Sequence, residues 1–256
     1  MTQKKDLKNE SLAEIAIDPD ILAKELSVEL EIDPLEQIDE DSFSKGNLNK
    51  NSECEEALKL LKGDREQRIQ GLRVFCEYRD KRSFPLLLPL LDQPCPVERM
   101  SAVYALGRNP CPSAVQKLVN LLETDDNAYV RRATAWSLAN YDNQIVLKPL
   151  INSLKNDVAA VRLWSSSSLA EIGAISSHNA QLAAEQLLIS LKIDNEPVVR
   201  SNCIWSLCRL FENLNDIFQE SFVDECTKIA LFDKEPSVME EAKTALDSMG
   251  MQGFYN

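Results

Sequence analysis

Apolar residues in most of this chain follow the spacing of an α-helix, and they recur in a repeated phrase. In each copy a basic position is followed three and six residues later by small residues and seven residues later by an apolar residue. The spacings between successive copies are 31, 32, 31, 38 and 39 residues, and the first positions are Arg68, Arg99, Arg131, Arg162, Arg200 and Met239. Self-similarity at this period is typical of a solenoid, whose units bury their apolar faces only against their neighbours. The sequence therefore predicts an all-α helical-repeat solenoid of about six two-helix units.

The rest of each repeat predicts a first helix and a short turn ahead of the phrase. The first helices are Leu-rich and are expected over residues 84–91, 114–122, 145–154, 180–191 and 222–232. The turn that follows each of them contains Asp or Asn, whose side chains accept hydrogen bonds from the free N–H groups at a helix start. The two longest spacings are expected to come from residues added between helices, near 172–180 and 212–221.

The basic position of the phrase lies at the edge of the buried helix face. On a helical wheel the small and apolar positions share one face, and the arginine lies roughly 75° from its centre. Its recurrence predicts a structural role, with the guanidinium held by a carboxylate of the adjoining turn such as Asp126 or Asp157. Binding of a ligand or partner is the alternative role, and its candidate residues are Arg99, Arg131, Arg162 and Arg200.

Aromatic residues recur five positions after the basic position, on the opposite side of the second helix. They are Tyr104, Trp136 and Trp205, with Ser167 in the remaining central copy. In a solenoid the second helices line the concave side, so these side chains are expected to form a broken stripe there. Exposed aromatic clusters favour recognition of a partner or a flat ligand. Coverage by a neighbouring unit or by the N-terminal residues is the alternative.

The N-terminal residues differ in composition from the repeats. Residues 1–50 contain thirteen acidic and six basic residues, a net charge of −7, and two Asp-Pro turn signals. Apolar residues at roughly helical spacing between Ile21 and Leu30 allow one short amphipathic helix. We expect residues 1–53 to form an acidic, flexible N-terminal arm and residues 54–256 to form the solenoid.

Charge and composition exclude several classes of function. The net charge of −13 argues against nucleic-acid binding, which needs clustered positive charge. The acidic surface either attracts a basic partner or keeps the array soluble. No apolar run approaches the roughly 20 residues that span a bilayer, and no signal region follows the N-terminus. The seven cysteines are odd in number and contain no CxxC, which favours a reducing compartment. These features predict a cytoplasmic protein without membrane insertion.

The repeated phrase resembles that of HEAT-repeat proteins. The resemblance is carried by the stretch from Cys95 to Pro110, CPVERMSAVYALGRNP, together with Val161-Arg162-Leu163-Trp164 and Val199-Arg200. The spacing near 31 is similar to that of the subtype found in phycobilin lyase subunits. The residues most resemble a cyanobacterial, lyase-related group of HEAT proteins that partner the A-type iron–sulfur scaffold protein. Two departures are Glu98, where Val is usual, and Met239, where Arg is usual; Met239 predicts a degenerate capping unit.

Two functions follow from these features. The first is an adaptor that binds a protein partner on its concave face, in iron–sulfur or cofactor delivery, with the iron–sulfur scaffold protein as the partner. The alternative, implied by the resemblance, is a subunit or relative of a phycobilin lyase that helps attach bilin to a phycobiliprotein subunit. The aromatic stripe would then hold the transferred bilin, and the repeated arginines its propionates.

Independent catalysis and metal binding have little support in the sequence. The single histidine, His178, cannot form the paired His-Glu motifs that hold two irons, and the glycines form no phosphate-binding loop. Cys95 and Cys111 bracket one helix at roughly 18 Å and cannot share a metal. The sequence therefore predicts no catalytic residues, no metal ligands and no resident cofactor, so any cluster would belong mainly to the partner.

Overall fold

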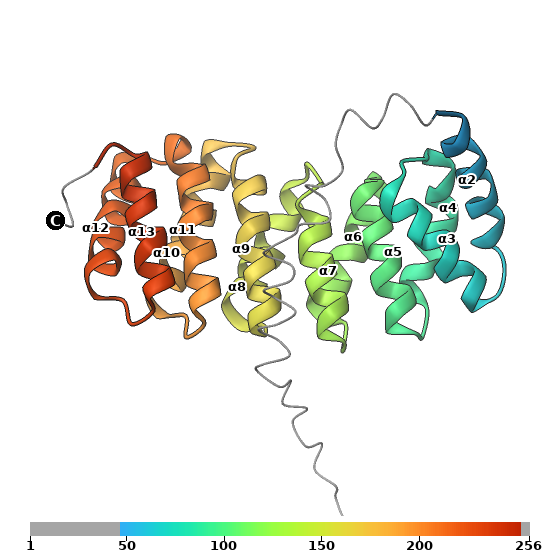
Figure 1. Ribbon diagram of the computed structural model, residues 1–256, viewed down its shortest axis with the longest axis horizontal. Coiled ribbons are helices and arrows are strands. Elements are labelled where there is room, and N and C mark those ends of the chain that lie inside the picture. The colour runs from blue at the N-terminus through green and yellow to red at the C-terminus, as the bar shows by residue number, and fades with distance from the viewer. Residues whose placement is uncertain (1–46, 252–256) are drawn as a thin grey trace, which may run out of the picture. The chain divides into compact units, whose positions relative to one another are not determined.

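The computed structural model describes residues 47–251, and all regular elements in this range are helical (Figure 1). Twelve α-helices form six successive pairs. The first helices are α2 (Asn47–Leu60), α4 (Phe84–Leu87), α6 (Val115–Thr124), α8 (Leu147–Asn156), α10 (Ser177–Ile193) and α12 (Asp216–Phe232). The second helices are α3 (Arg65–Glu77), α5 (Pro96–Arg108), α7 (Ala128–Leu138), α9 (Ala159–Gly173), α11 (Pro197–Leu210) and α13 (Pro236–Ser248). The predicted all-α solenoid of six two-helix units is confirmed.

Short 3₁₀ helices join the units. In the second unit η3 (Leu88–Asp92) continues α4 and completes the first helix. The others are η2 (Lys81–Ser83), η4 (Pro112–Ala114), η5 (Gln144–Val146) and η6 (Phe211–Asn213). The helix predicted between Ile21 and Leu30 and most of the predicted arm lie outside the described residues, so the flexibility of the arm stays a prediction. Helix α2 begins at Asn47, within the range assigned to the arm.

The second helices begin where the sequence places its turn residues. Pro96, Pro197 and Pro236 occupy the first positions of α5, α11 and α13, where a missing N–H leaves no bond unmade. Asn127 caps α7, and its side chain accepts from the backbone N–H groups of Tyr129 and Val130. Each second helix therefore starts at a fixed point after the turn, which places the repeated phrase in the same register in every unit.

The small positions of the phrase are buried and let the second helices approach closely. Ser168 in α9 donates to the carbonyl of Ala135 in α7 at 2.8 Å. Ser206 in α11 donates to the carbonyl of Ser166 in α9 at 2.9 Å. Such bonds require the backbone of one helix to lie within reach of a short side chain on the next. The second helices accordingly form one continuous layer, side by side in Figure 1, and contact each other more extensively than the first helices do. This difference curves a solenoid toward its second helices.

The prediction for the longer repeat spacings was wrong in part. The added residues were expected between helices, but many of them extend the first helices of the last two units. Helices α10 and α12 each have 17 residues, against 10 in α6 and in α8. Apolar helix positions such as Ala180 and Phe222 continue the buried face, so the extra length packs instead of looping out. In the part of the chain described here, no helix combines the length and the apolar character needed to cross a membrane.

Candidate functional site

The repeated basic residues form a ladder of ion pairs along one edge of the second helices. Each arginine binds a carboxylate of the next unit, with a shortest nitrogen–oxygen distance of 2.7 Å in every pair. The five pairs of this ladder are Arg68–Glu98, Arg99–Asp125, Arg131–Asp157, Arg162–Asp194 and Arg200–Asp233. In the four pairs with aspartate, Nε and Nη2 each donate to a separate carboxylate oxygen. This bidentate geometry fixes both the distance and the orientation between neighbouring units.

Asp125, Asp157 and Asp194 of the ladder each join three parts of the chain, as Asp194 illustrates. Its carboxylate accepts from Arg162 of the preceding unit and from the backbone N–H of Glu196. Its backbone carbonyl accepts from Nη1 of Arg200 at 2.9 Å, in its own unit. The hydrogen bonds to Asp194 raise the pKa of Arg162, although burial acts in the opposite direction. The turn and both arginines are thus held in one network, which is the structural role that the sequence predicts for the repeated arginine.

The two departures from the repeated phrase are explained by the ladder. Gln93 lies six residues before Arg99, at the place where the aspartate stands in most other units. Glu98, which lies within helix α5 and not in the turn, binds Arg68 in place of a turn aspartate. Glu98 is only 2% exposed. Met239 belongs to the last unit, where no following turn offers a carboxylate. An arginine there would have no partner of this kind among the described residues, so the loss of the basic residue marks the end of the ladder.

The candidate arginines are therefore bound within the chain. Arg99, Arg131, Arg162 and Arg200 have their guanidinium groups between two turns, with exposures of 12–19%. The predicted carboxylate Asp157 is confirmed, whereas the partner of Arg99 is Asp125 and not Asp126. Asp126 contributes its backbone carbonyl to Arg131 instead. In the structure Asp125 is buried and Asp126 is exposed, a difference that two adjacent aspartates in a sequence do not reveal.

The aromatic residues also lie on the second helices, five positions after the basic position and so on a different side of each helix from the ladder arginines. The rings of Tyr104 and Trp136 are tilted, with centroids 5.3 Å apart, a favourable geometry for aromatic pairs. Gly107 makes room for this pair, because a Cβ atom at its position would lie 2.5 Å from Cζ3 of Trp136. Trp205 is 41% exposed, and the guanidinium of Arg209 lies 5.2 Å from its ring centroid. We call Tyr104, Trp136 and Trp205 the aromatic row.

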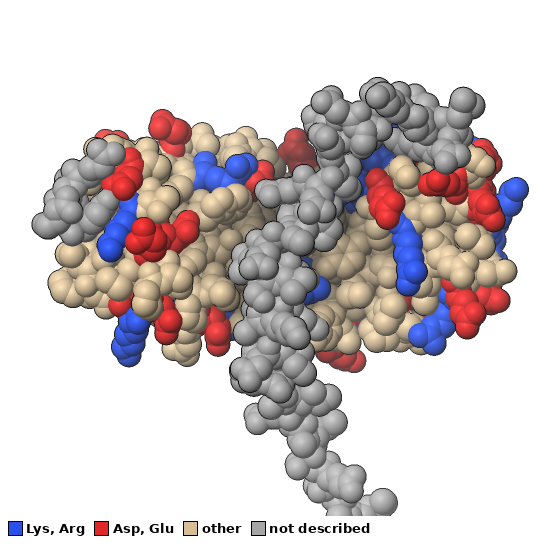
Figure 2. All heavy atoms as spheres, in the orientation of Figure 1, with Lys and Arg blue, Asp and Glu red and all other residues tan. Residues whose placement is uncertain are grey.

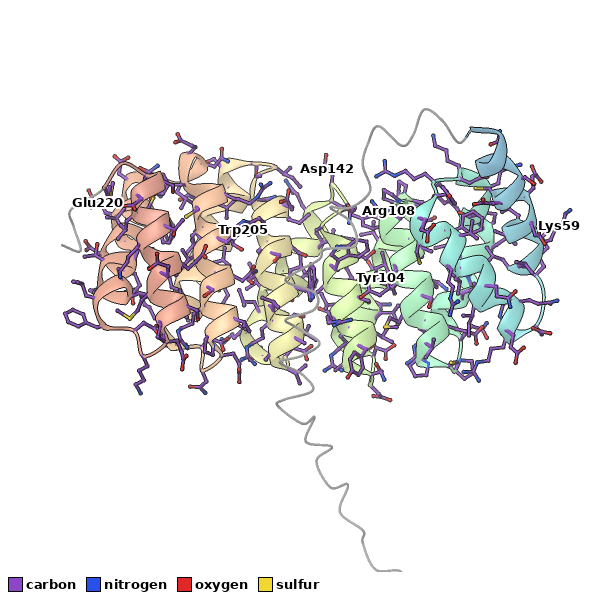
Figure 3. All side chains as sticks on the ribbon, in the orientation of Figure 1. Lys59, Tyr104, Arg108, Asp142, Trp205 and Glu220 are labelled. Atoms are coloured by element: carbon purple, nitrogen blue, oxygen red, sulfur yellow. The ribbon has the colours of Figure 1, made fainter. Side chains whose placement is uncertain are left out.

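Helix α9 interrupts the aromatic row with a polar position. Ser167 occupies the equivalent place, and Asn202 of α11 donates to its hydroxyl at 2.7 Å. The same amide also donates to Ser166 and to the carbonyl of Leu163. The row is therefore divided into a Tyr104–Trp136 pair and a single Trp205. Figure 3 shows Tyr104 on α5 and Trp205 on α11, in different halves of the layer.

Two arginines accompany the aromatic pair and were not singled out from the sequence. Arg132 donates to the hydroxyl of Tyr104 at 3.4 Å, and its guanidinium lies 5.6 Å from the ring centroid of Tyr129. Arg108, one turn after Tyr104 on α5 (Figure 3), donates through Nε to the carbonyl of Cys76 at 3.3 Å. Its Nη2 is buried and makes no hydrogen bond. Arg108 has a counterpart in Arg209 of α11, whereas Arg132 has none in the other units, so the periodic pattern gave little signal for them.

The thiols and the histidine do not converge on a site within residues 47–251. The cysteines form no disulfide in this range, and no three side chains of the metal-binding types come together there. Burial raises the pKa of Cys76 to about 12 and that of Cys208 to about 11. Hydrogen bonds from the backbone N–H groups of Glu98 and Val97 lower the pKa of Cys95. His178 is exposed near the start of α10.

Known structures with a similar fold are repeat proteins. One is a designed armadillo repeat protein in complex with the peptide (KR)4, with a TM-score of 0.56 and 18% identity over 78% of this chain and 98% of that one. An engineered protein gives a TM-score of 0.57 and 20% identity, over 77% of this chain and 98% of that one. Importin beta gives a TM-score of 0.59 and 16% identity, over 91% of this chain but only 34% of importin beta. In a comparison with curated proteins, none matches significantly.

A sequence profile of the HEAT-repeat family matches two overlapping segments, residues 55–139 and 115–208. Together these segments cover residues 55–208, which is more than half of the chain, and they include all five arginines of the ladder. The matched units are those whose second helices carry the phrase most regularly. The chain therefore belongs to the family of HEAT-repeat proteins.

Proposed function

We propose that this protein is a binding scaffold that holds a segment of a partner protein against its second-helix layer. The observation that carries the proposal is the aromatic row, which places large side chains on a surface where the fold does not need them exposed. Trp205 is 41% exposed in a layer whose packing positions are filled by small and apolar residues. Exposed tryptophan and tyrosine on a rigid surface supply contact area at little cost in conformational entropy.

The packing of the layer supports this role. The ladder fixes the spacing of successive second helices, so the aromatic side chains are held in place before any partner arrives. Binding to a pre-organised surface loses less conformational entropy than binding to a mobile one. In Figure 2 much of the described surface that is visible beside the grey residues carries no charged side chains, which suits contact with apolar parts of a partner. A structural neighbour is a designed armadillo repeat protein in complex with a peptide, so this architecture is compatible with peptide binding.

The first partners to test are those implied by the sequence resemblance: an A-type iron–sulfur scaffold protein and a phycobiliprotein subunit. Each would be purified and titrated into the full-length protein by calorimetry. Trp136→Ala and Trp205→Ala should each weaken the productive interaction by at least about tenfold, as expected for aromatic anchors at an interface. Ile217→Ala is the matched control, because Ile217 is 76% exposed but lies on α12, in the first-helix layer. Equal losses for all three variants would contradict the proposal.

The bilin-related alternative makes a separate prediction. A linear tetrapyrrole would stack on the aromatic row and need cations for its propionates. The four ladder arginines proposed from the sequence already bind aspartates, so they are poorly placed to hold the propionates. Addition of phycobilin to the purified protein should then shift the pigment absorption, and Trp136→Ala should reduce the shift. An unchanged spectrum at saturating protein would exclude this role for the isolated chain.

A further inference from the structure

Helix α10 exposes apolar residues on the outer side of the first helices. Leu182, Ile189 and Ile193 are 38%, 43% and 72% exposed. They are seven and four residues apart, which places them on one face of the helix. The residues that α10 buries against the rest of the fold, such as Ala183 and Leu187, lie on its other faces. We call Leu182, Ile189 and Ile193 the α10 stripe.

The neighbouring first helices are not apolar in this way. Ile189 and Ile193 lie five residues and one residue before Asp194, which follows the end of α10. The residues at these two positions are Asn120 and Thr124 in α6, Asn152 and Asn156 in α8, and Lys228 and Phe232 in α12. Among these four helices only α10 is apolar at both positions, so the repeat does not require apolar side chains there. Exposed apolar clusters of this kind mark interaction surfaces.

The helices on either side of α10 carry opposite charges. Helix α10 contacts both α8 and α12. Helix α8 contains two exposed lysines, Lys148 and Lys155, and no acidic residue. Helix α12 contains four acidic residues and one lysine, and its exposed carboxylates include Glu220 and Asp224. The α10 stripe therefore lies between a basic helix and an acidic helix.

Two of these opposite charges lie at the same height along the helices. Lys148 of α8 and Asp224 of α12 each lie nine residues before the ladder aspartate that follows their helix, Asp157 and Asp233. These aspartates occupy equivalent places in the ladder, so they set the two helices in the same register. Lys148 and Asp224 are exposed, and neither has an ion-pair partner among residues 47–251. Both are thus available to a molecule that covers the α10 stripe.

We propose that the α10 stripe binds a second copy of this chain in a two-fold symmetric dimer. A two-fold axis parallel to the helices brings the two stripes together and places α8 of each copy opposite α12 of the other. Lys148 then faces Asp224 of the second copy at the same height, and this contact occurs twice. With the axis across the helices α8 would face α8, and like charges disfavour that arrangement. An apolar centre with opposite charges on its two sides is complementary to itself.

The shape of the solenoid determines the strength and the consequence of this pairing. The first helices lie on the outer side of its curve, so two such surfaces meet over a few helices only. A standard interface buries about 800 Å² on each partner, and we expect this one to be no larger and the dimer to be weak. The two second-helix layers would face away from each other and could bind two segments of one partner at once. The pairing uses the first helices alone, so it does not depend on the proposed scaffold function.

Sedimentation velocity of the full-length protein, between about 1 and 300 μM, measures this equilibrium because dimerisation depends on concentration. We expect a reversible dimer and no larger species, since a two-fold contact closes on itself. The double variant Ile189→Asn and Ile193→Asn should weaken the dimer by at least about tenfold. Val97→Asn is the matched control, because Val97 is 46% exposed but lies on α5, and it should change nothing.

Several results of this measurement would overturn the inference. A monomer at every concentration would leave the α10 stripe to a different occupant. Species that continue to grow with concentration would indicate a head-to-tail contact, which does not close. Equal losses for the double variant and for Val97→Asn would show that the stripe is not the interface. Circular dichroism checks that each variant is folded.

Charge reversal tests the arrangement of the two copies. Lys148→Asp and Asp224→Lys should each weaken the dimer by about three- to tenfold, because like charges then face each other at both contacts. An equimolar mixture of the two variants should restore the dimer, since opposite charges face each other at both contacts of the mixed dimer. A mixture that associates no better than either variant alone would contradict the two-fold pairing.

Trp205→Ala distinguishes this surface from the aromatic row. The variant should leave the dimer unchanged, because Trp205 lies on α11 in the second-helix layer. The double variant of α10 should likewise leave the affinity of each chain for a single-site partner unchanged. Loss of the dimer in Trp205→Ala would place the second copy on the aromatic row and overturn the inference.

Discussion

The ladder and the aromatic row both lie on the second-helix layer, but they differ in regularity and in the exposure of their side chains. In the ladder each arginine has a carboxylate partner in the next unit and a backbone acceptor in the preceding turn, and the arginine side chains are 12–22% exposed. In the aromatic row Trp205 is 41% exposed, and Ser167 breaks the repetition. Recurrence alone therefore does not identify a binding residue. A recurring residue is structural when its partner recurs with it, whereas Trp205 is a binding candidate because its ring is exposed.

Breaking the ladder should have the largest effect. Arg162→Ala would leave the carboxylate of Asp194, which is 6% exposed, without its bidentate partner and would free the carbonyl of Asp157. Removal of one member of a largely buried pair costs more than the pair contributes, and we expect a loss of about 2–3 kcal/mol in the free energy of unfolding. Urea denaturation measures this loss.

Arg209→Ala is the control for the ladder variant. Its pair with Glu171 is 48% and 43% exposed, so its removal should cost less than about 1 kcal/mol. The two variants remove the same side chain from second helices of adjacent units. Equal costs would mean that the ladder contributes no more than an ordinary surface ion pair.

Crowding the aromatic pair should have the next largest effect. Gly107→Ala places a Cβ atom 2.5 Å from Cζ3 of Trp136, so the indole or helix α7 must move. Overpacking of this kind costs about 1–3 kcal/mol. The same substitution in a Trp136→Ala background should cost much less, because the clashing ring is absent. A cost that is independent of Trp136 would place the effect in the helix backbone instead of the aromatic pair.

Removing an exposed member of the aromatic row should separate stability from binding. Trp205→Ala should lower the free energy of unfolding by less than about 1 kcal/mol, because much of the ring faces water. The same variant should weaken partner binding by at least about tenfold, which corresponds to about 1.4 kcal/mol. Thermal unfolding and calorimetric titration give the two values. A large loss of stability with unchanged binding would assign the residue to the core.

Acid should weaken the last ion pair of the ladder, Arg200–Asp233, and we expect this to be the smallest of the four predicted effects. The pKa of Asp233 lies below its usual value, because hydrogen bonds from Arg200 and from the backbone outweigh the opposing effect of burial. A carboxyl group with a lowered pKa in the folded state stabilises the protein above its unfolded pKa, near pH 4, and this contribution is lost as the pH falls through the lower folded value. Asp233→Asn should therefore flatten the decrease in stability below pH 4. A steeper decrease in the variant would contradict this assignment.

The sequence predicted the parts of the structure that repeat. The helix pairs, the buried positions of the phrase and the binding of Arg131 by Asp157 all follow from periodicity, because each recurs in the same register. The replacement of a turn aspartate by Glu98 was visible only as a departure. The role of Glu98 in the ladder could be recognised only after the structure showed which side chain Arg68 contacts.

The parts that occur once could not be predicted in the same way. Gly107 reads as an ordinary small residue, and its contact with Trp136 depends on the distance between α5 and α7. Arg108 and Arg132 occupy different positions of the phrase, and the contacts of Arg108 with Cys76 and of Arg132 with Tyr104 depend on helix packing. The extension of α10 and α12 was missed because the added residues contain both turn-like and apolar positions.

Hydrogen–deuterium exchange of the full-length protein, with and without a saturating purified partner, tests the division of roles most directly. The account predicts new protection in the second helices that bear the aromatic row, with most of it in α5, α7 and α11. The turn amides of Asn127, Glu196 and Glu235 already donate to ladder aspartates, so their exchange should stay unchanged. Protection confined to these turns or to the first helices would contradict the account, because it would place the partner on the ladder or on the opposite face.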